Sequence, residues 1–374
     1  MAHAVTNVVT RFSTHRCARL FWLCVVNSLP RVRLVEWRPK LIRFPRNASL
    51  PAALLACGLL ACGSPAVAQT AAQEPPNYPT RPVKIIAPQA PGGGVDLVGR
   101  VVADRMSRAM GQTFVIDNQA GAGGAIASQA TARAAPDGYT LMIGYVATHG
   151  TNPAVRRSPY DAIKDFTPIA MIGGTPNLFV VSPALPVHTL QEFVLYARAN
   201  PTKVDYGTSG KGTLNHLLME QFKAAANFPS LSVPYKSIGQ AFTDLMGGQV
   251  RAIFPGLAAG LPHVRSGAVR PLGVTGLKRH PILPGVPTFK ESGYEDFDGL
   301  TWYGIVGPAK MPPAIVKKLN EEINQILAQP DFRDKLAGEA LDTMPMTPEQ
   351  FGQYMAKEIV HWTKIARASK IEVE

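Results

Sequence analysis

The sequence predicts an α/β fold with mainly parallel sheets flanked by helices, and three observations lead to this prediction. Short, continuous apolar runs recur along the chain, as expected of strands that are covered on both faces. Segments with apolar residues at helical spacing lie between these runs. Glycine-rich turns follow several of the runs, and strands that alternate with helices are typical of parallel sheets.

Nine segments are expected to form strands, because each is a short and mostly apolar run. The chain shows no internal repeat and no low-complexity domain. The predicted strands are Val83–Ala87, Thr113–Asp117, Leu141–Tyr145, Leu178–Val181, Val204–Tyr206, Leu231–Val233, Arg251–Phe254, Arg270–Val274 and Trp302–Val306.

Several helices between these strands have recognisable ends. Val95–Met110 carries an apolar stripe at helical spacing, and Gly111 is expected to end that helix. A threonine followed three residues later by a glutamate predicts a helix over 189–200. Prolines after a turn predict two further starts, one at 311–313 and one at 347–350.

The first 68 residues have the order of a secretory leader: basic residues, the apolar run Leu50–Cys62, and a small-residue site at 66–68. The apolar run is too short for an ordinary membrane helix. The segment before about residue 41 is unusual for a signal peptide, which indicates an over-long start or an extended leader. Cys62 ends a segment similar to a lipoprotein cleavage box, so a lipid anchor there is a minority alternative.

Most of the formal net charge of +12 lies in this leader. Nine of the 38 basic and one of the 26 acidic residues precede Gln69, which leaves 29 basic and 25 acidic residues and a net charge of +4. The composition therefore gives no support for nucleic-acid binding. All four cysteines also precede Gln69, so the mature chain is expected to have no disulfide, thiol nucleophile or cysteine metal site.

Four polar turns that follow strands are the candidate ligand-binding elements. They are 88–96, 118–124, 147–152 and 207–213. Glycine lets a ligand approach the backbone, and a helix N-terminus attracts anions. Ligands of open α/β sheets bind at the carboxyl ends of strands, so turns from two facing domains would converge on one cleft.

Motifs for catalysis and nucleotide binding are not matched. The segment 207–213 has Thr213 where a phosphate-binding P-loop needs lysine, and Lys211 where a nucleophile elbow needs glycine. Glycines 92–94 lack the third glycine of a dinucleotide fingerprint. No histidine after the leader has the spacing of a zinc site. We therefore expect no cofactor, no metal and no enzymatic activity.

Four polar residues in or beside these turns each allow a functional and a structural interpretation. His149 and His216 either contact a ligand or are hydrogen-bonded structural histidines. Lys211 is either a solvated lysine or a cation that faces a carboxylate. Asp96 either stabilises a helix N-terminus, the slightly preferred interpretation, or binds an amine.

Taken together, the motifs resemble those of the Bug receptors, the periplasmic solute-binding proteins of tripartite tricarboxylate transporters. The resemblance covers residues 78–370. The motifs that carry it are Tyr78–Val83, Ala90–Asp96, Asn118–Gly124, Ala135–Leu141, Asn200-Pro201, Tyr206–Gly210, Val233–Lys236, Asp244–Val250 and Leu283–Thr288.

This resemblance implies a two-lobed periplasmic-binding-protein (Venus-flytrap) fold in which each lobe is a mainly parallel sheet flanked by helices. Lobe 1 would be residues 78–179 plus 303–374, and lobe 2 would be 180–302. Strands near 178–181 and 301–303 would cross between the lobes. A periplasmic monomer suits a carrier that docks on a membrane partner.

The resemblance also implies that a small carboxylate is bound through backbone amides and ordered water. Lys211 and Asp96 join the candidate ligand-binding residues on the arguments above. The residues carried over from the family are Ala90, Pro91, Gly92, Gly93, Thr148, His149, Thr208, Ser209, Gly212 and Thr213.

Two departures from the family pattern bear on the ligand. Pro255-Gly256 stands where many relatives have an Asp-Asn-like pair, which weakens the case for an amino-acid ligand. Lys211 stands where relatives usually have a neutral residue, which suggests attraction for a second carboxylate.

The expected function is therefore a receptor that captures a small organic acid and delivers it to the membrane subunits of a tripartite transporter. The alternative is a periplasmic sensor that presents its ligand complex to a sensor kinase. A secreted hydrolase is a third possibility, but no nucleophile–base–acid set supports it.

Overall fold

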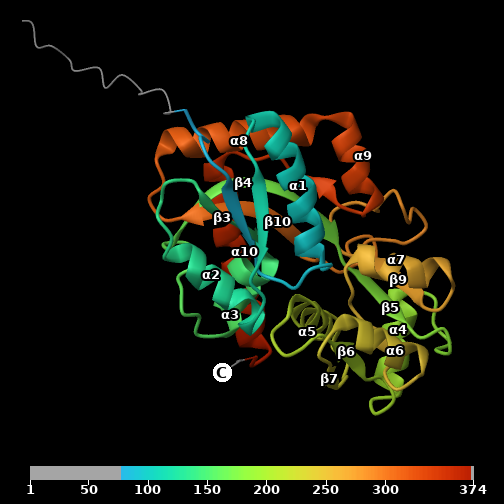
Figure 1. The fold of residues 1–374 in the computed structure, drawn as a ribbon. Helices are drawn as coiled ribbons and strands as arrows, with labels where there is room; N and C mark the ends of the chain where they lie inside the picture. Colours follow the sequence, from blue (N-terminus) through green and yellow to red (C-terminus); the bar gives the residue numbers. More distant parts are fainter. Residues whose placement is uncertain (1–76, 372–374) are drawn as a thin grey trace, which may run out of the picture. The chain divides into compact units, whose positions relative to one another are not determined.

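Two sheets with flanking helices organise the computed structural model of this chain, which describes residues 77–371 (Figure 1). The expected leader, its cleavage segment and Cys62 lie outside the described residues. The predicted α/β fold class is confirmed. Within residues 77–371, no helix combines the length and the apolar character needed to cross a membrane.

The first sheet has six strands in the order β11-β4-β10-β3-β1-β2. Strand β1 pairs in parallel with β2 and β3, while β10 runs antiparallel to both β3 and β4. The strands are β1 (Val83–Ala87), β2 (Phe114–Asn118), β3 (Thr140–Tyr145), β4 (Phe166–Pro176), β10 (Leu300–Pro308) and β11 (Asp342–Thr343).

The second sheet has five strands in the order β7-β6-β8-β5-β9. Strand β6 pairs in parallel with β7 and β8, while β5 runs antiparallel to β8 and β9. The strands are β5 (Leu178–Val181), β6 (Tyr206–Thr208), β7 (Ser232–Pro234), β8 (Ala252–Ile253) and β9 (Arg270–Val274).

Both sheets are therefore mixed, which corrects the expectation of mainly parallel pairing. The chain leaves the first sheet at the end of β4, enters the second at β5, and returns to the first through β10. Because β4 and β10 carry the chain between the sheets in opposite directions, they lie antiparallel to each other. Parallel pairing is present between β1, β2 and β3 in the first sheet and between β6, β7 and β8 in the second.

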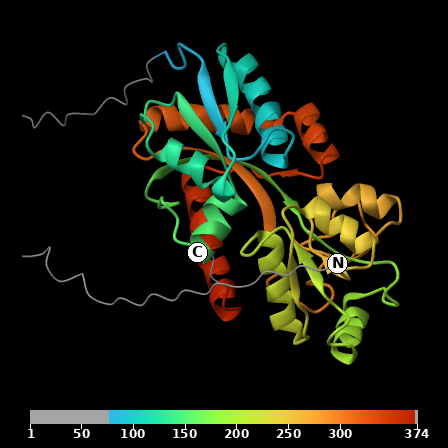
Figure 2. The ribbon, with the colours of Figure 1, turned by 60° about the horizontal axis from the view of Figure 1, so that its bottom comes forward.

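Helices cover both sheets. In the first sheet, α10 packs on β4 and lies beside α3, although the two helices are far apart in sequence (Figure 2). The helices with the first sheet are α1 (Gly94–Met110), α2 (Ala125–Ala132), α3 (Asn152–Val155), α8 (Pro313–Ala328), α9 (Pro330–Gly338) and α10 (Pro348–Ala368). Those with the second are α4 (Leu190–Ala199), α5 (Leu214–Ala226), α6 (Ile238–Met246) and α7 (Leu257–Arg265).

The helix ends predicted from the sequence are confirmed. The backbone N–H of Glu192 donates to the Thr189 hydroxyl at 3.1 Å, at the start of α4. Thr347 and Gln350 form both bonds of a capping box at α10. Gly111 has a φ of 69° and ends α1 in the left-handed conformation.

Strand β4 was missed in the sequence because prolines and glycines interrupt it at 168, 173–174 and 176. The glycines have a packing reason. A Cβ at Gly173 would lie 2.2 Å from the carbonyl oxygen of Asp342, so β11 approaches β4 closely at this point. The two-residue strand β11 was also missed, and the other strands were found. Strand β6 begins at Tyr206, two residues later than predicted.

Candidate functional site

The predicted turns lie at the carboxyl ends of parallel strands, as expected, and form one group at each sheet. At the first sheet, the turns after β1, β2 and β3 meet each other. At the second sheet, the turn after β6 leads into α5. No hydrogen bond joins the two groups among the residues that the structure describes.

Asp96 holds the turn between β1 and α1 in place. Its buried carboxylate accepts hydrogen bonds from the Gly92 backbone N–H at 2.9 Å, the Asn118 amide at 2.9 Å and Arg100 at 3.0 Å. The hydrogen bond from Arg100 lowers the pKa of Asp96 to about 2. The structure thus favours the structural interpretation of Asp96, and the Gly92 N–H is already occupied.

The first turn of α1 provides backbone donors instead. Gly93 caps the helix without a side-chain hydrogen bond, and in the described part of the chain the N–H groups of Gly94, Val95 and Asp96 have no partner. Such groups, together with the helix dipole, favour a carboxylate or another anion. Of the predicted Ala90–Gly93 segment, the N–H groups of Gly92 and Gly93 are bonded within the turn, whereas that of exposed Ala90 has no partner among the described residues.

A tyrosine that the sequence did not single out stands next to these donors. A Cβ at Gly94 would lie 2.8 Å from the hydroxyl oxygen of Tyr303 on β10. Burial, followed by the nearby Tyr145 phenol, raises the pKa of Tyr303, and burial raises that of Tyr145 to about 12. Both phenols are therefore neutral hydrogen-bond donors at neutral pH.

Close glycine contacts bring the three turns of the first sheet together. A Cβ at Gly124, in the turn after β2, would lie 2.5 Å from Thr148 Cγ2 and 3.2 Å from Pro88 Cβ. The Asn152 amide donates to the carbonyl of Gly123 at 2.8 Å. The turns after β1, β2 and β3 therefore form one structural unit, as the sequence predicted.

The side chains of Thr148 and His149 are buried and contact each other. Both are fully buried, and the Thr148 hydroxyl lies 2.9 Å from His149 Nδ1. The His149 ring packs edge-on against Phe166 with 4.6 Å between ring centroids, and burial lowers its pKa to about 3. These contacts lie at the one-turn π-helix Ala147–Thr151, and the buried His149 Nε2 has no partner among the described residues. Ligand contact by the two residues stays a prediction.

The turn after β6 is held by Asn215 and His216. The side-chain oxygen of Asn215 accepts hydrogen bonds from the Ser209 backbone N–H and the Thr213 hydroxyl. The side-chain NH₂ of Asn215 donates to the Ser209 hydroxyl. The Gly212 N–H donates to His216 Nδ1 at 3.0 Å, which requires that nitrogen to be unprotonated. Burial lowers the pKa of His216, so the ring is a neutral structural acceptor at neutral pH.

The remaining predicted residues of this turn differ in exposure. Thr208 is buried, and its hydroxyl accepts from the Gly210 N–H at 3.3 Å. Lys211 is exposed, and its ammonium has no ion-pair partner among the described residues. The Thr213 hydroxyl at the start of α5 accepts no hydrogen bond from the N-terminal N–H groups of that helix.

Sequence reasoning gave no role to the side chains of Tyr303, Tyr145 and Asn215, nor to those of Asn118 and Asn152 within the predicted turns. Tyr303 and Tyr145 were part of predicted strands, and an aromatic residue there has the same pattern as a core residue. The asparagines lie in or beside the predicted turns, where an asparagine side chain commonly forms hydrogen bonds that hold the turn. Their particular partners depend on tertiary contacts.

A cavity among the described residues lies away from these turns, beside the second sheet. Groups of histidine, cysteine, aspartate and glutamate that could hold a metal ion are absent from residues 77–371. The predicted ligand-binding elements thus offer backbone N–H groups, hydroxyls and one lysine.

Comparison with known proteins identifies the family to which this chain belongs. Residues 98–371 match the family described as "Tripartite tricarboxylate transporter family receptor". Protein BugT of Bordetella pertussis is 34% identical over 295 residues, which cover 78% of this chain and 90% of BugT. A UPF0065 protein from the tcbD-tcbE intergenic region of Pseudomonas sp. strain P51 is 35% identical over 297 residues, covering 79% and 88%.

Solved structures agree with this assignment. A protein from R. palustris, solved with adipate, has a TM-score of 0.72 and 35% identity, and the match covers 79% of this chain and 99% of that one. MatC from Rhodopseudomonas palustris, with bound malate, has a TM-score of 0.68 and 30% identity, with 77% and 99% covered.

Proposed function

Because this chain belongs to the tripartite tricarboxylate transporter receptor family, whose members are periplasmic solute-binding proteins, we propose that it captures a small carboxylate and delivers it to membrane transporter subunits. Relatives solved with adipate and with malate support a dicarboxylate as ligand. The protein would act as a monomer in the periplasm, after removal of the leader, and without catalysis.

The observation that carries this proposal is the first turn of α1. The free N–H groups of Gly94, Val95 and Asp96 and the hydroxyl of Tyr303 form a donor set of neutral groups. Charge-assisted hydrogen bonds from such fixed donors bind a carboxylate strongly without a cationic partner. Asp96 keeps the turn rigid by binding Gly92, so little ordering is needed when the ligand arrives.

The second sheet would supply the remaining contacts. We propose lobes of residues 78–179 with 303–374 and of residues 180–302, with ligand contacts from Ser209, Gly212 and Thr213 in the second. The ligand would favour a closed arrangement through contacts with both lobes, and the transporter would recognise that arrangement.

The experiment that tests the function is thermal unfolding of the chain from Gln69 with adipate, malate and their uncharged diamides. A ligand that binds only the folded state raises the unfolding midpoint by mass action, by about 2.7 kcal/mol of stability at a hundredfold excess over Kd. We expect a rise with at least one acid and none with its diamide. No rise with any small carboxylate would contradict the proposal.

Tyr303→Phe is the matched variant for this experiment. The Tyr303 hydroxyl has no hydrogen-bond partner among the described residues, so its removal should leave the midpoint without ligand nearly unchanged. We expect affinity for the responding acid to fall about tenfold or more, as is usual for a lost hydrogen bond to a charged group. Unchanged affinity would remove Tyr303 from the proposed contacts.

Lys211→Gln tests whether the second carboxylate of the ligand is recognised by charge. If Lys211 faces that carboxylate, the variant should bind a dicarboxylate about two- to fivefold more weakly, in keeping with the roughly 0–1 kcal/mol of an exposed ion pair. Binding of a monocarboxylate should not change. Isothermal titration at two salt concentrations measures both, and equal losses for the two acids would contradict the role.

A further inference from the structure

A polar cavity of about 370 Å³ lies at the opposite end of the second sheet from the turn after β6. Lys203 and Asp205 come just before β6, and Arg251 comes just before β8. Because β6 and β8 are parallel, these residues lie at the amino ends of the strands, whereas 209–213 follow the carboxyl end. The cavity is therefore separate from the proposed ligand site.

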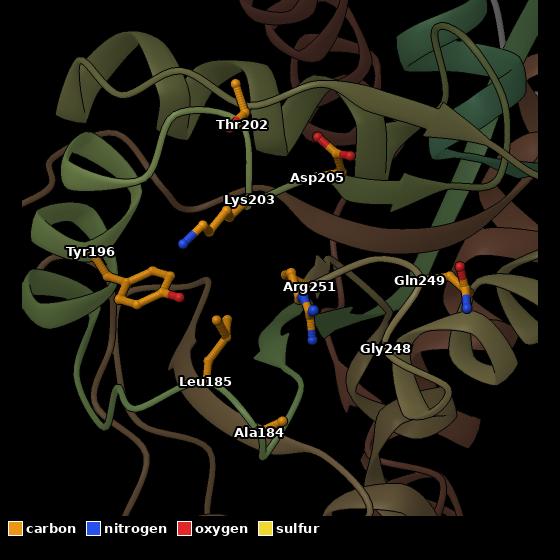
Figure 3. Close-up of a pocket in the computed structure, with 9 residues that line it drawn as sticks. All are labelled: Ala184, Leu185, Tyr196, Thr202, Lys203, Asp205, Gly248, Gln249 and Arg251. Carbon is orange, nitrogen blue, oxygen red and sulfur yellow. The ribbon is translucent and has the colours of Figure 1, made fainter.

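Polar side chains converge on this cavity without binding each other. Figure 3 shows the Lys203 ammonium, the Tyr196 hydroxyl and the Arg251 guanidinium directed into the space that they enclose. Asp205 and Gln249 also line it. Over residues 77–371, none of these five side chains forms a hydrogen bond or an ion pair with the protein.

Asp205 forms no ion pair with either cation among the described residues. Lys203 is exposed, and Asp205 and Arg251 are half-buried, so all three charges are accessible to solvent and to a solute. Here the guanidinium and the ammonium keep all their donors available, and the lining carries two positive charges against one negative. An arginine fork next to a lysine is well suited to an oxyanion such as phosphate or carboxylate.

The walls of the cavity are fixed by the fold. Arg270 at the start of β9 donates to the carbonyls of Leu185 and Val187, both at 2.8 Å, and this holds the segment that contributes Leu185 to the lining. The Arg251 N–H donates to the Asp205 carbonyl at 2.8 Å, which ties the two charged residues together through the backbone. The volume of about 370 Å³ lies within the range of small-molecule sites.

We propose that this cavity binds a small oxyanion that still carries a hydroxyl proton, with hydrogen phosphate and hydroxylated phosphate esters as the chemical class. The anionic oxygens face Lys203 and Arg251, and the hydroxyl donates to Asp205. This proposal does not depend on the function proposed for the first site, because no residue is shared between them.

Thermal unfolding at constant ionic strength tests the proposal, with chloride replaced by inorganic phosphate, glycerol phosphate or sulfate. We expect the midpoint to rise with phosphate or its ester, by about 5 °C at a hundredfold excess over Kd. A larger rise with inorganic phosphate would indicate the free anion as the ligand, and a larger rise with glycerol phosphate would indicate a phosphate ester. Sulfate has no proton at neutral pH and should give a smaller rise.

The double variant Lys203→Gln/Arg251→Gln should lose this response. The control Lys278→Gln/Arg265→Gln removes two exposed charges outside the cavity and should keep it, as should Tyr303→Phe. Tyr196→Phe is a milder second variant, expected to weaken binding about threefold or more by loss of one hydrogen bond. No response of the unmodified protein, or equal loss in both double variants, would overturn the proposal.

The variant Asp205→Asn tests whether Asp205 accepts a hydrogen bond from a hydroxyl of the ligand. The amide can donate as well as accept, so this variant should bind sulfate about as well as phosphate. If the unmodified protein already responds equally to sulfate and phosphate, the assignment of Asp205 as acceptor of a ligand proton is wrong.

Discussion

Replacing Trp362 by alanine is expected to lower the free energy of unfolding by about 3 to 5 kcal/mol, the usual cost of removing a buried tryptophan. The side chain is fully buried in α10, with 0% of its surface exposed. Chemical denaturation of the chain from Gln69, followed by circular dichroism, measures the change. We expect the midpoint to fall while the dependence on denaturant stays similar.

The contacts of Trp362 explain the size of this effect. Its indole N–H donates to Glu358 Oε2 at 3.1 Å, and the same oxygen accepts the indole N–H of Trp302 at 2.9 Å. Burial raises the pKa of Glu358, which makes these two donors important for its charged form. A Cβ at Gly299 would lie 3.0 Å from the Trp362 ring and 3.4 Å from Leu218, so the ring also fills space against α5 and the start of β10.

Two variants separate these contributions. Val360→Ala changes a neighbouring residue of α10 that is 71% exposed, so it should change stability by less than about 0.5 kcal/mol. Trp362→Phe keeps a ring but removes the N–H, and a loss of about 1 to 3 kcal/mol is expected. If Trp362→Ala were no more destabilising than Val360→Ala, the interpretation of this cluster would be wrong.

Replacing Gly124 by alanine is expected to cost at least 3 kcal/mol of stability, on the order of backbone strain and core overpacking added together. The residue has a φ of 94°, and its new Cβ would meet Thr148 Cγ2 at 2.5 Å. Because Thr148 is fully buried and bonded to the Tyr145 backbone, it cannot turn aside easily. The turns after β1, β2 and β3 would therefore separate, and affinity for the responding acid should fall about tenfold or more.

Gly111→Ala is a close control for this variant. Gly111 also has a positive φ, 69°, but nothing lies within 4 Å of the position of its Cβ. Its replacement should cost only the conformational strain, about 1 to 2 kcal/mol, and should leave ligand binding unchanged. Equal effects of the two variants on stability and binding would show that the contact with Thr148 has no importance of its own.

Local signals in the sequence were sufficient for the helix ends and for most strands. The capping residues of α4 and α10 act through hydrogen bonds within a few residues, so the sequence alone indicates them. Strand β4 shows the limit of such signals. Its prolines and glycines are typical of a turn, but in the structure Gly173 leaves room for β11 and the strand pairs with β10 from end to end.

The candidate site divides in the same way. The motifs together indicated the family that the comparisons bear out, whereas ligand binding at the glycine-rich turns stays a prediction. The roles of single residues could not be predicted. Asp96 and His149 are both polar residues in candidate turns. In the structure, Asp96 accepts hydrogen bonds that hold its turn, whereas His149 is buried, neutral and packed against Phe166.

The sequence by itself thus determined the fold class, the helix ends and the strand–turn–helix positions of the candidate turns, because these depend on periodicity and on contacts between near neighbours. Tertiary structure alone decided the mixed pairing of the sheets, the placing of Tyr303 beside the first turn of α1, and the cavity between Lys203 and Arg251. Each of these joins residues that are far apart in the chain. Their meeting depends on how whole strands pack, which no local pattern records.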